Sequence, residues 1–370
     1  MLVGFRVQRL RDLDTSAVSF TVVGPGGLPV ESVEVFLAHL VAVGRSPNTI
    51  AGYAHDLRDF VEWLDQVGRG FRVLSLEELT GFFSWVARPV AARVPGVFVL
   101  PGTPSAIASA TLVRKRAALA SFYRFHARRD ASVPALLGSS AGPRATGEFV
   151  PMLVHTRRAR QGPEMVSPIR IAVSRKPAIA LSDAQVARLV AVCARRRDRF
   201  LLILLDQTGL RLGEALGLRH ADLRLRAGEV RVVPREGNVN AARVKGLKAR
   251  VVPAGAVVFD AYADYMEVEY GVLDSDWVFV NLFRPPVGAP MTAGAVAKLV
   301  GRLRERTGIA GFTPHVLRHG YATRLLRAGV PVEVVAELLG HASATTTSQT
   351  YSHLGVEDHR RALQTAGVLA

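Results

Sequence analysis

Apolar residues recur at helical spacing through the first third of the chain. Ser46-Pro47-Asn48-Thr49 supplies a helix start, and Gly68 supplies an end. Between them the apolar positions follow the period of a helix, at Ile50, Tyr53, Leu57, Phe60, Val61 and Leu64. After a Pro/Gly-rich stretch, VPGVFVLPGTPS, a second helical run occupies residues 109–129. The pattern predicts a small all-helical domain over residues 31–130.

The segments on either side of this domain lack a helical period. Residues 1–30 form an N-terminal extension with a β-prone run, AVSFTVV, and a PGG turn. Residues 131–178 hold repeated Pro and Gly and many arginines, which indicates a long basic interdomain linker. Its charge favours a strap that crosses the DNA backbone, with a solvated tether between domains as the alternative.

A second domain is predicted over residues 179–370. It opens on a capping box, in which Ser182 is the N-cap and Gln185 lies three residues later. We expect a first helix that runs through Arg196, followed by a buried helix around FLLILLDQTG. Two β-prone runs, EVRVVP and ARVVPA, predict a small antiparallel sheet, and further helices start at Thr313-Pro314 and Val330-Pro331. The domain is therefore α+β, within a chain that is mainly α.

Composition adds a class of partner to this picture. The 370 residues carry a formal net charge of +16 with a pI of about 10.9, which points to a polyanion. The strongest apolar run, Phe200 to Leu205, is too short to span a membrane, and no secretory signal is visible at the N-terminus. We therefore expect nucleic acid as the partner and no membrane. The single cysteine, Cys193, lies in an apolar run, where a buried thiol is expected, and it fits a reducing cytoplasm.

The candidate chemistry lies in four short stretches of the second domain: TGLRLGEALGL, TPHVLRHGYAT, ELLGHA and SQTYSHL. In order they hold Arg211, His315, Arg318, His341 and Tyr351. Attack of a hydroxyl on a DNA phosphodiester develops a second negative charge, so catalysis rests on positioned cations and hydrogen-bond donors. An arginine fork pairs with two phosphate oxygens at once. The set predicts phosphodiester cleavage by the tyrosine hydroxyl, with the two arginines as a clamp.

The local pattern also predicts where some of these side chains point. The Thr-Pro helix start puts His315 and Arg318 on one face of a first turn, where the helix N-terminus favours an anion. We expect the neighbouring His319 to point away from both. Leu317 and Tyr321 are expected to face the core.

Other residues of the set have competing interpretations. Gly340 is expected to end a helix, so that His341 lies just beyond it; a histidine that only closes the helix end is the alternative. Tyr351, ten residues later (351 − 341), lies in a polar stretch, yet alone it would be an ordinary half-buried tyrosine. Glu214 is a candidate for orienting Arg211, or else a simple acid on a helix surface.

Together these stretches resemble the tyrosine recombinase, or phage integrase, family. The likeness is strongest over residues 179–365, and SPNTIAGYAHDLRDFVEWL resembles the first core-binding helices of Xer-type recombinases. It implies a helical SAM-like core-binding domain and a catalytic domain that close as a C-shaped clamp around double-stranded DNA at its core sites. The helical domain would contact DNA through the basic residues of its second run: Arg114, Lys115, Arg116 and Arg124.

The resemblance also implies a reaction. Tyr351 would form a 3′-phosphotyrosyl bond and free a 5′-hydroxyl, while the two arginines and two histidines named above bind the scissile phosphate. RVKGLKARVVP resembles the family's K-G-x-K-x-R-x-V-P pattern, which makes Lys245 the general acid for the leaving oxygen. Lys248 would be a DNA backbone contact or a plain solvated charge. No cofactor, ATP or divalent metal would be needed. A dimer on each site would pair into a tetramer that exchanges strands through a Holliday junction, and an accessory protein or partner recombinase is a further candidate partner.

Two features depart from a minimal Xer protein. The spacing from His341 to Tyr351 is one residue longer than in many Xer-type members, and the extension and the basic linker are additional. Both favour integration, excision or transposition by a mobile-element or phage enzyme over a housekeeping resolvase. The tail GVEDHRRALQTAG predicts a short helix that docks on a neighbouring protomer or packs in cis. We expect a cytoplasmic protein associated with the nucleoid.

Other functions explain less of the sequence. A DNA-binding protein that keeps the recombinase fold without catalysis accounts for the charge, but not for a full set of active-site residues. A type IB topoisomerase or a telomere resolvase uses similar chemistry, but the compact spacing and modest length favour a recombinase. A zinc site would need His315, His319, His341 and His353, which lack a cysteine pair and the usual zinc spacings, so no metal site is predicted.

Overall fold

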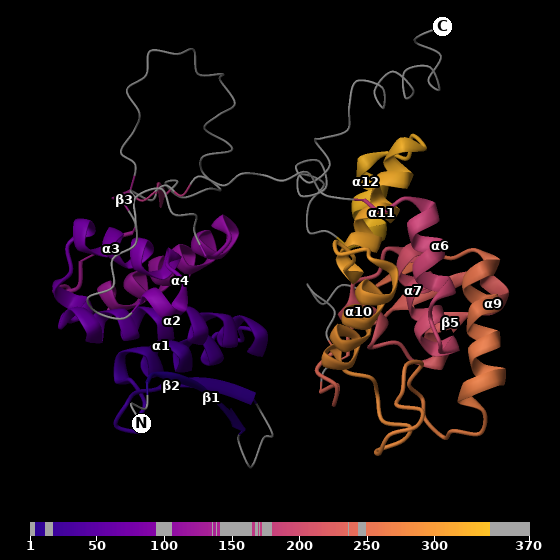
Figure 1. Ribbon diagram of the computed structural model, residues 1–370, viewed down its shortest axis with the longest axis horizontal. Helices are drawn as coiled ribbons and strands as arrows, with labels where there is room; N and C mark the ends of the chain where they lie inside the picture. Colours follow the sequence, from indigo (N-terminus) through magenta and orange to yellow (C-terminus); the bar gives the residue numbers. More distant parts are fainter. Residues whose placement is uncertain are drawn as a thin grey trace, which may run out of the picture. The chain divides into compact units, whose positions relative to one another are not determined.

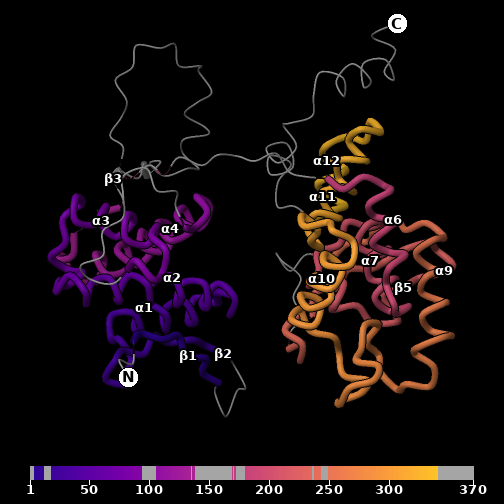
Figure 2. Tube along the Cα trace, viewed as in Figure 1, coloured from indigo at the N-terminus to yellow at the C-terminus, as the bar shows by residue number. Residues whose placement is uncertain are grey.

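The computed structural model describes residues 4–11, 18–93, 106–134, 136–137, 139–140, 165–166, 169, 171, 180–235, 237–242 and 249–340. The chain divides into two compact units, Met1–Arg175 and Lys176–Ala370. Figures 1 and 2 show that both units are built mainly of helices, with short strands in each. The prediction of a mainly helical chain is therefore confirmed. No helix among the described residues is long and apolar enough to cross a membrane.

The first unit begins with a β-hairpin, in the segment that the sequence predicted only as β-prone. Strands β1 (Arg6–Arg11) and β2 (Val18–Val23) pair antiparallel and lie beside the first helices (Figure 1). Val22 of β2 is fully buried and belongs to the same apolar cluster as Val33 of α1 (Glu31–Ala42). The hairpin is thus built into the core of the unit.

Helices with well-defined ends make up the rest of the first unit. The Ser46 hydroxyl accepts a hydrogen bond from the backbone N–H three residues later, at 3.2 Å, and Gly68 ends the same helix in the left-handed region, both as predicted. The core between the helices is aromatic, with the rings of Phe36, Phe60 and Phe122 in edge-to-face contact. The remaining elements are α2 (Pro47–Val67), a 3-10 turn (Phe71–Val73), α3 (Leu76–Ala87), a 3-10 turn (Val90–Ala92), α4 (Ser109–Ala127), β3 (Ser139–Ser140) and β4 (Met165–Val166).

The second unit combines helices with one small antiparallel sheet, as predicted. The sheet has the strand order β5-β6-β7, formed by Leu223–Arg224, Glu229–Val232 and Arg250–Pro253. The helices are α6 (Asp183–Ala191), α7 (Arg196–Thr208), α8 (Leu212–Ala215), α9 (Ala256–Tyr265), α10 (Ala293–Thr307), α11 (Pro314–Arg327) and α12 (Val332–Leu339). Short 3-10 turns at His220–Asp222 and Leu225–Ala227 and a π-helical turn at Met266–Tyr270 complete it.

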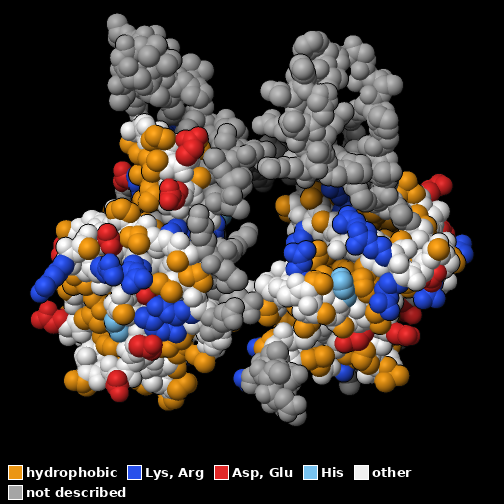
Figure 3. Space-filling model, turned by 180° about the vertical axis from the view of Figure 1, so that it is seen from behind, with side chains coloured by type: hydrophobic (Ala, Val, Ile, Leu, Met, Phe, Trp, Pro, Cys, Tyr) orange, Lys and Arg blue, Asp and Glu red, His pale blue; other side chains and the backbone are white. Residues whose placement is uncertain are grey.

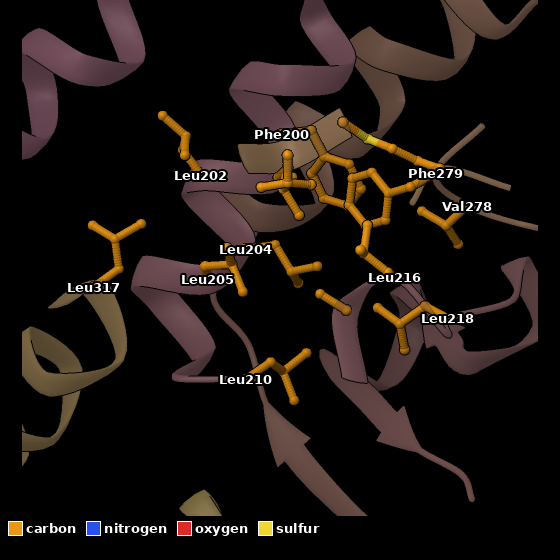
Figure 4. Close-up of a cluster of buried hydrophobic side chains, with 14 of the residues drawn as sticks. Phe200, Leu202, Leu204, Leu205, Leu210, Leu216, Leu218, Val278, Phe279 and Leu317 are labelled. Carbon is orange, nitrogen blue, oxygen red and sulfur yellow. The ribbon is translucent and has the colours of Figure 1, made fainter. Parts of the chain in front are cut away.

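Helix α7 is the centre of this unit. Phe200 and several leucines of α7 pack in a core that also contains Leu317 of α11 and Phe279 from the chain before α10 (Figure 4). Fully buried leucines on both sides of Gly209, Leu205 and Leu210, hold the exit of α7 in this core. Since α8 begins at Leu212, soon after this buried segment, the core also fixes the position at which α8 starts.

One predicted helix boundary in this unit is wrong. The capping box of Ser182 and Gln185 is present, but the helix that it opens ends at Ala191 and does not run through Arg196. Instead Arg196 is the first residue of α7, and the residues between leave the helical conformation. The apolar period continues across this break because both helices bury their apolar residues in the same core, so periodicity alone could not reveal it.

Candidate active site and DNA contacts

Arg211 lies directly after the α7 exit and precedes α8 as its N-cap residue. Its backbone N–H and its Nη1 donate to the two carboxylate oxygens of Glu214, each at 2.9 Å. The Glu214 side chain is fully buried, whereas 23% of the Arg211 side chain is exposed. A buried carboxylate thus holds the arginine at its base and leaves part of the guanidinium in contact with solvent. Glu214 is therefore not a surface acid, which was one of its two interpretations.

Gly209 makes the turn that delivers Arg211. It has a φ of 61°, in the left-handed region that favours glycine. A Cβ added there would overlap the ring of Tyr321 on α11. The turn between α7 and α8 can therefore pass this close to α11 only because residue 209 has no side chain.

Arg318 approaches the same turn from α11. It is 3% exposed, and its Nη1 and Nη2 donate to the carbonyls of Gly209 and Leu339, each at 2.7 Å. The Nη2 of Arg211 donates to the next carbonyl, that of Gly340, at 3.0 Å. The two arginines therefore meet at the C-terminal end of α12, where unsatisfied carbonyls and the helix dipole favour cations.

His315 lies in the first turn of α11, beside the two arginines. The helix begins where the Thr313 hydroxyl accepts a hydrogen bond from the N–H of Val316 at 3.2 Å, as expected of a Thr-Pro start. Burial, and then the charges of Arg318 and Arg211, lower the pKa of His315. The ring is therefore mainly neutral at pH 7 and can donate one hydrogen bond and accept another.

The expectation that His319 points away from His315 is wrong. The two rings contact each other edge to face, with their centroids 4.4 Å apart. Residues four apart lie one above the other on a helix face, and this spacing outweighs the adjacency of His319 to Arg318. His319 therefore packs against the His315 ring and restricts its orientation. Leu317 is buried, and Tyr321 is partly buried against α12, as expected.

Arg250, at the start of β7, is a site residue that the sequence interpretation missed. Its Nη1 and Nη2 donate to the Glu214 carboxylate at 3.1 and 2.6 Å, and its Nε donates to the carbonyl of Leu338 at 2.8 Å. Burial raises the pKa of Glu214, but the hydrogen bonds and charges of Arg250 and Arg211 outweigh it and hold that pKa below its usual range. Arg250 is the arginine of the K-G-x-K-x-R-x-V-P pattern, so the pattern itself carried the signal.

Several predicted site residues lie outside the described residues. These are Lys245, Lys248, His341 and Tyr351. The described chain reaches Ala242 and resumes at Ala249 on either side of the two lysines, and it reaches Gly340 directly before His341. Gly340 ends α12 in the left-handed region, as predicted. The roles of these four residues remain predictions.

The predicted DNA contacts of the first unit lie on α4, where one of them is wrong. Lys115 is 5% exposed, and its ammonium binds Asp56 at 3.1 Å and Asp59 at 2.6 Å, both on α2. An ammonium buried between two carboxylates cannot also bind a phosphate, so Lys115 belongs to the core. Arg116 is half-buried and donates to the carbonyl of Ile169 at 2.8 Å.

The exposed side of α4 is nevertheless basic. Arg114 and Arg124 are both exposed, and Arg128 directly after the helix continues the same stripe. The stripe positions between them hold the small residues Ala117 and Ser121. Arg114 is paired with Asp56 but keeps 52% of its side chain exposed. Arg128 is therefore a better candidate for a DNA contact than Lys115, and the helical period from Arg114 could have found it.

Comparison with known proteins places the chain in a family. Residues 180–357 match the model of the phage integrase family, and residues 33–130 match that of the phage integrase N-terminal SAM-like domain. Transposase A from transposon Tn554 of Staphylococcus aureus is 31% identical over 331 residues, or 89% of each chain. Tyrosine recombinase XerC of Nitrobacter winogradskyi is 31% identical over 88% of this chain and 89% of its own.

Solved structures share the fold. The Tn1549 transposon integrase in complex with a circular intermediate DNA matches with a TM-score of 0.60 at 17% identity, over 90% of this chain and 99% of that one. A lambda integrase dimer bound to a COC′ core site matches with a TM-score of 0.58 at 16% identity, over 88% of this chain and 96% of that one. With the sequence relatives and both family models, this shows that the chain belongs to the phage integrase, or tyrosine recombinase, family of DNA strand transferases that act in site-specific recombination.

Proposed function

We propose that this chain is a mobile-element recombinase that cuts and rejoins double-stranded DNA at a specific site through a covalent bond to Tyr351. The observation that carries the proposal is the meeting of Arg211 and Arg318 at the last carbonyls of α12. The stretch that contains His341 and Tyr351 begins at that same helix end. The two cations and the segment of the nucleophile therefore share one anchor.

In the proposed reaction, the Tyr351 oxygen bonds to phosphorus as the phenol loses its proton, and the bond from phosphorus to the 5′ oxygen breaks. Lys245 gives a proton to that oxygen, which leaves as a 5′-hydroxyl. Attack by the 5′-hydroxyl of another strand then reverses these steps, rejoins the DNA and restores the phenol. One phosphate ester is exchanged for another at each step, so the reaction needs no ATP.

The charges around the site suit a phosphodiester whose charge grows in the transition state. Arg211 and Arg318 are fixed before the substrate arrives, so little reorganisation is needed when the second negative charge develops. His315 and His341 would add neutral or charged hydrogen-bond donors to the nonbridging oxygens. A tyrosine hydroxyl has an ordinary pKa of about 10, and the cations of the clamp would lower the cost of its ionisation. Loss of one such donor typically raises the barrier by about 3 kcal/mol.

Backbone contacts would come from both units. On the face drawn in Figure 3, Lys and Arg side chains gather in patches on each unit. We assign the stripe of Arg114, Arg124 and Arg128 on α4 to the DNA backbone, because the small residues between these arginines let the helix approach closely. Lys248 is a further candidate for such a contact. We further propose one dimer on each DNA site and a tetramer in the synapse. The protein would act on DNA in the nucleoid.

The mobile-element assignment rests on the relatives and on the added segments. The transposase of Tn554 is similar over 89% of both chains, and an integrase of a second transposon, Tn1549, shares the fold. The built-in N-terminal hairpin and the basic segment 131–178 are features beyond the two matched family domains. Integration or excision of an element therefore suits this chain better than chromosome maintenance.

Covalent capture tests the proposal. The protein is incubated in EDTA with a pool of nicked duplexes of random sequence, and protein-linked DNA is recovered after denaturation, treated with protease and sequenced. We expect one enriched site joined to protein through its 3′ phosphate. Tyr351→Phe should bind that site with unchanged affinity and form no adduct. An adduct that persists in Tyr351→Phe, or one that needs a divalent metal, would overturn the proposal.

A further inference from the structure

Four charged side chains and one helix end form a closed network in the second unit. Three consecutive carbonyls at the end of α12 each accept from a different arginine: Leu338 from Arg250, Leu339 from Arg318, and Gly340 from Arg211. The Glu214 carboxylate joins two of these arginines, because it accepts from both Arg211 and Arg250. A shift of Arg250 therefore moves the carboxylate that holds Arg211, and a shift of any of the three arginines moves the helix end to which the other two bind.

We propose that Arg250 is a positioning residue for strand cleavage, which sets Arg211 through Glu214 and the end of α12 through the Leu338 carbonyl, and thereby aligns the phosphate clamp. The inference rests on the proposed function. Each of the three guanidinium nitrogens of Arg250 donates to an oxygen of Glu214 or Leu338, so Arg250 acts through these neighbours.

The fit of Arg250 to its partners is close on both sides. Its Nη1 and Nη2 bind the Glu214 carboxylate side by side, which is the paired geometry that an arginine fork allows and a lysine ammonium does not. On the other side, a Cβ added to Gly340 would lie only 2.9 Å from the Arg250 Nη1. The helix end therefore rests directly on the guanidinium, and Gly340, with its φ of 62°, is the residue type that permits it.

Arg250 also links the clamp to the sheet. It is the first residue of β7 and pairs with Val232 of β6 in the antiparallel ladder. Lys245, the proposed general acid, precedes it by five residues (250 − 245). The strand that carries the chain away from Lys245 is thus held at its first residue by the same guanidinium that holds Glu214.

The test compares binding with chemistry in single turnovers. The substrate is a nicked duplex of the site that the wild-type protein captures, and the readouts are the DNA dissociation constant and the cleavage rate at saturating DNA. We expect Arg250→Lys and Arg250→Gln to cleave about 100-fold more slowly, as small misplacements of catalytic groups do, with affinity changed less than about 2-fold. Arg231→Lys, an arginine on the neighbouring strand β6 with no ion pair to the described residues, is the matched control and should cleave at the wild-type rate.

A double substitution separates positioning from loss of fold. Arg250→Gln alone leaves one cation fewer on a buried carboxylate, so its folding is checked by circular dichroism and thermal unfolding. Combining it with Glu214→Gln removes both buried charges together. Because Arg250 acts on Arg211 through Glu214, the double variant should lose less than the product of the two single losses.

The outcomes are distinct. Wild-type cleavage by Arg250→Lys, or losses that multiply in the double variant, would refute the role of Arg250 while leaving the proposed function intact. A matching drop in DNA affinity would show a binding role and would refute it as well. Absence of cleavage by the wild-type protein would instead refute the proposed function.

Discussion

Arg318 donates a 2.7 Å hydrogen bond to the carbonyl of Gly209, across 109 residues of sequence. The bond joins the exit of α7 to the first turns of α11, and both flank the site. It exists because Gly209 lets the two segments approach, and because the buried guanidinium needs carbonyl partners.

A side chain at position 209 should therefore damage the fold as well as the site. Gly209→Ala places a Cβ against the Tyr321 ring at a positive φ, so we expect a loss of about 2 kcal/mol or more in the free energy of unfolding. Urea denaturation measures it. Gly311→Ala, with no atom within 4 Å of the added Cβ and no positive φ, is the control and should unfold within about 0.5 kcal/mol of wild type. Equal midpoints for the two variants would contradict the close approach.

Arg211→Lys should separate chemistry from binding. The ammonium keeps a charge but cannot bind Glu214, the Gly340 carbonyl and a phosphate with a planar fork, so the cleavage rate should fall about 100-fold to 1,000-fold. Single-turnover formation of the covalent adduct at saturating DNA measures the effect. Arg226→Lys, on an exposed 3-10 turn, serves as the control. A wild-type rate in Arg211→Lys would remove this residue from the clamp.

His315 predicts a pH dependence of DNA binding. In the free protein its pKa is lowered by burial and by the two arginines, so the folded chain resists protonation as the pH falls below about 6.5, the ordinary value for histidine. A bound phosphate adds negative charge and raises that pKa, so binding takes up a proton and should tighten as the pH falls below this value.

Titration of the dissociation constant between pH 5 and 7 for wild type and His315→Gln checks this dependence. The DNA affinity of the wild type should rise by up to about tenfold for each unit by which the pH falls, and His315→Gln should lack this rise. Parallel curves would contradict it. The same lowered pKa predicts that wild type loses folding stability as the pH falls below about 6.5, because the unfolded chain then binds a proton that the folded chain does not.

The α4 stripe and Lys115 should respond to different measurements. Arg124→Gln and Arg128→Gln should each lower the slope of log affinity against log salt by about 0.9 if each arginine neutralises one phosphate. Lys115→Gln removes the buried cation that Asp56 and Asp59 share, so it should cost about 3–5 kcal/mol of stability. At temperatures where it stays folded, its salt slope should match wild type. A reduced slope in Lys115→Gln would restore it as a DNA contact.

Local chemistry in the sequence was sufficient to predict the helix ends. The caps at Ser46, Ser182 and Thr313 and the left-handed ends at Gly68 and Gly340 all follow from hydrogen bonds within a few residues. The family motifs were likewise sufficient for the fold and the class of reaction, because they preserve order along the chain.

The contacts that sequence reasoning missed are mostly between distant segments. Lys115 meets its two carboxylates across 59 and 56 residues, and Arg250 meets Glu214 across 36. The hydrophobic pattern of α4 or β7 carries no information about such distant partners. Lys115 could therefore only be predicted to face solvent, and Arg250 was left without a role. The contact between His315 and His319 is local, and the helical repeat alone predicts it. The prediction failed because it considered only that His319 follows Arg318 in the sequence.

The end of α12 also limits the reach of the nucleophile. Eleven residues (351 − 340) separate Gly340 from Tyr351, and a fully extended chain of that length spans at most about 36–40 Å. Since three arginines hold the last carbonyls of α12, the hydroxyl of Tyr351, the proposed nucleophile, is tethered within that radius of the proposed clamp. Attack by Tyr351 on a phosphate held by the same protomer would then be a first-order step, whose rate does not depend on how many protomers are present.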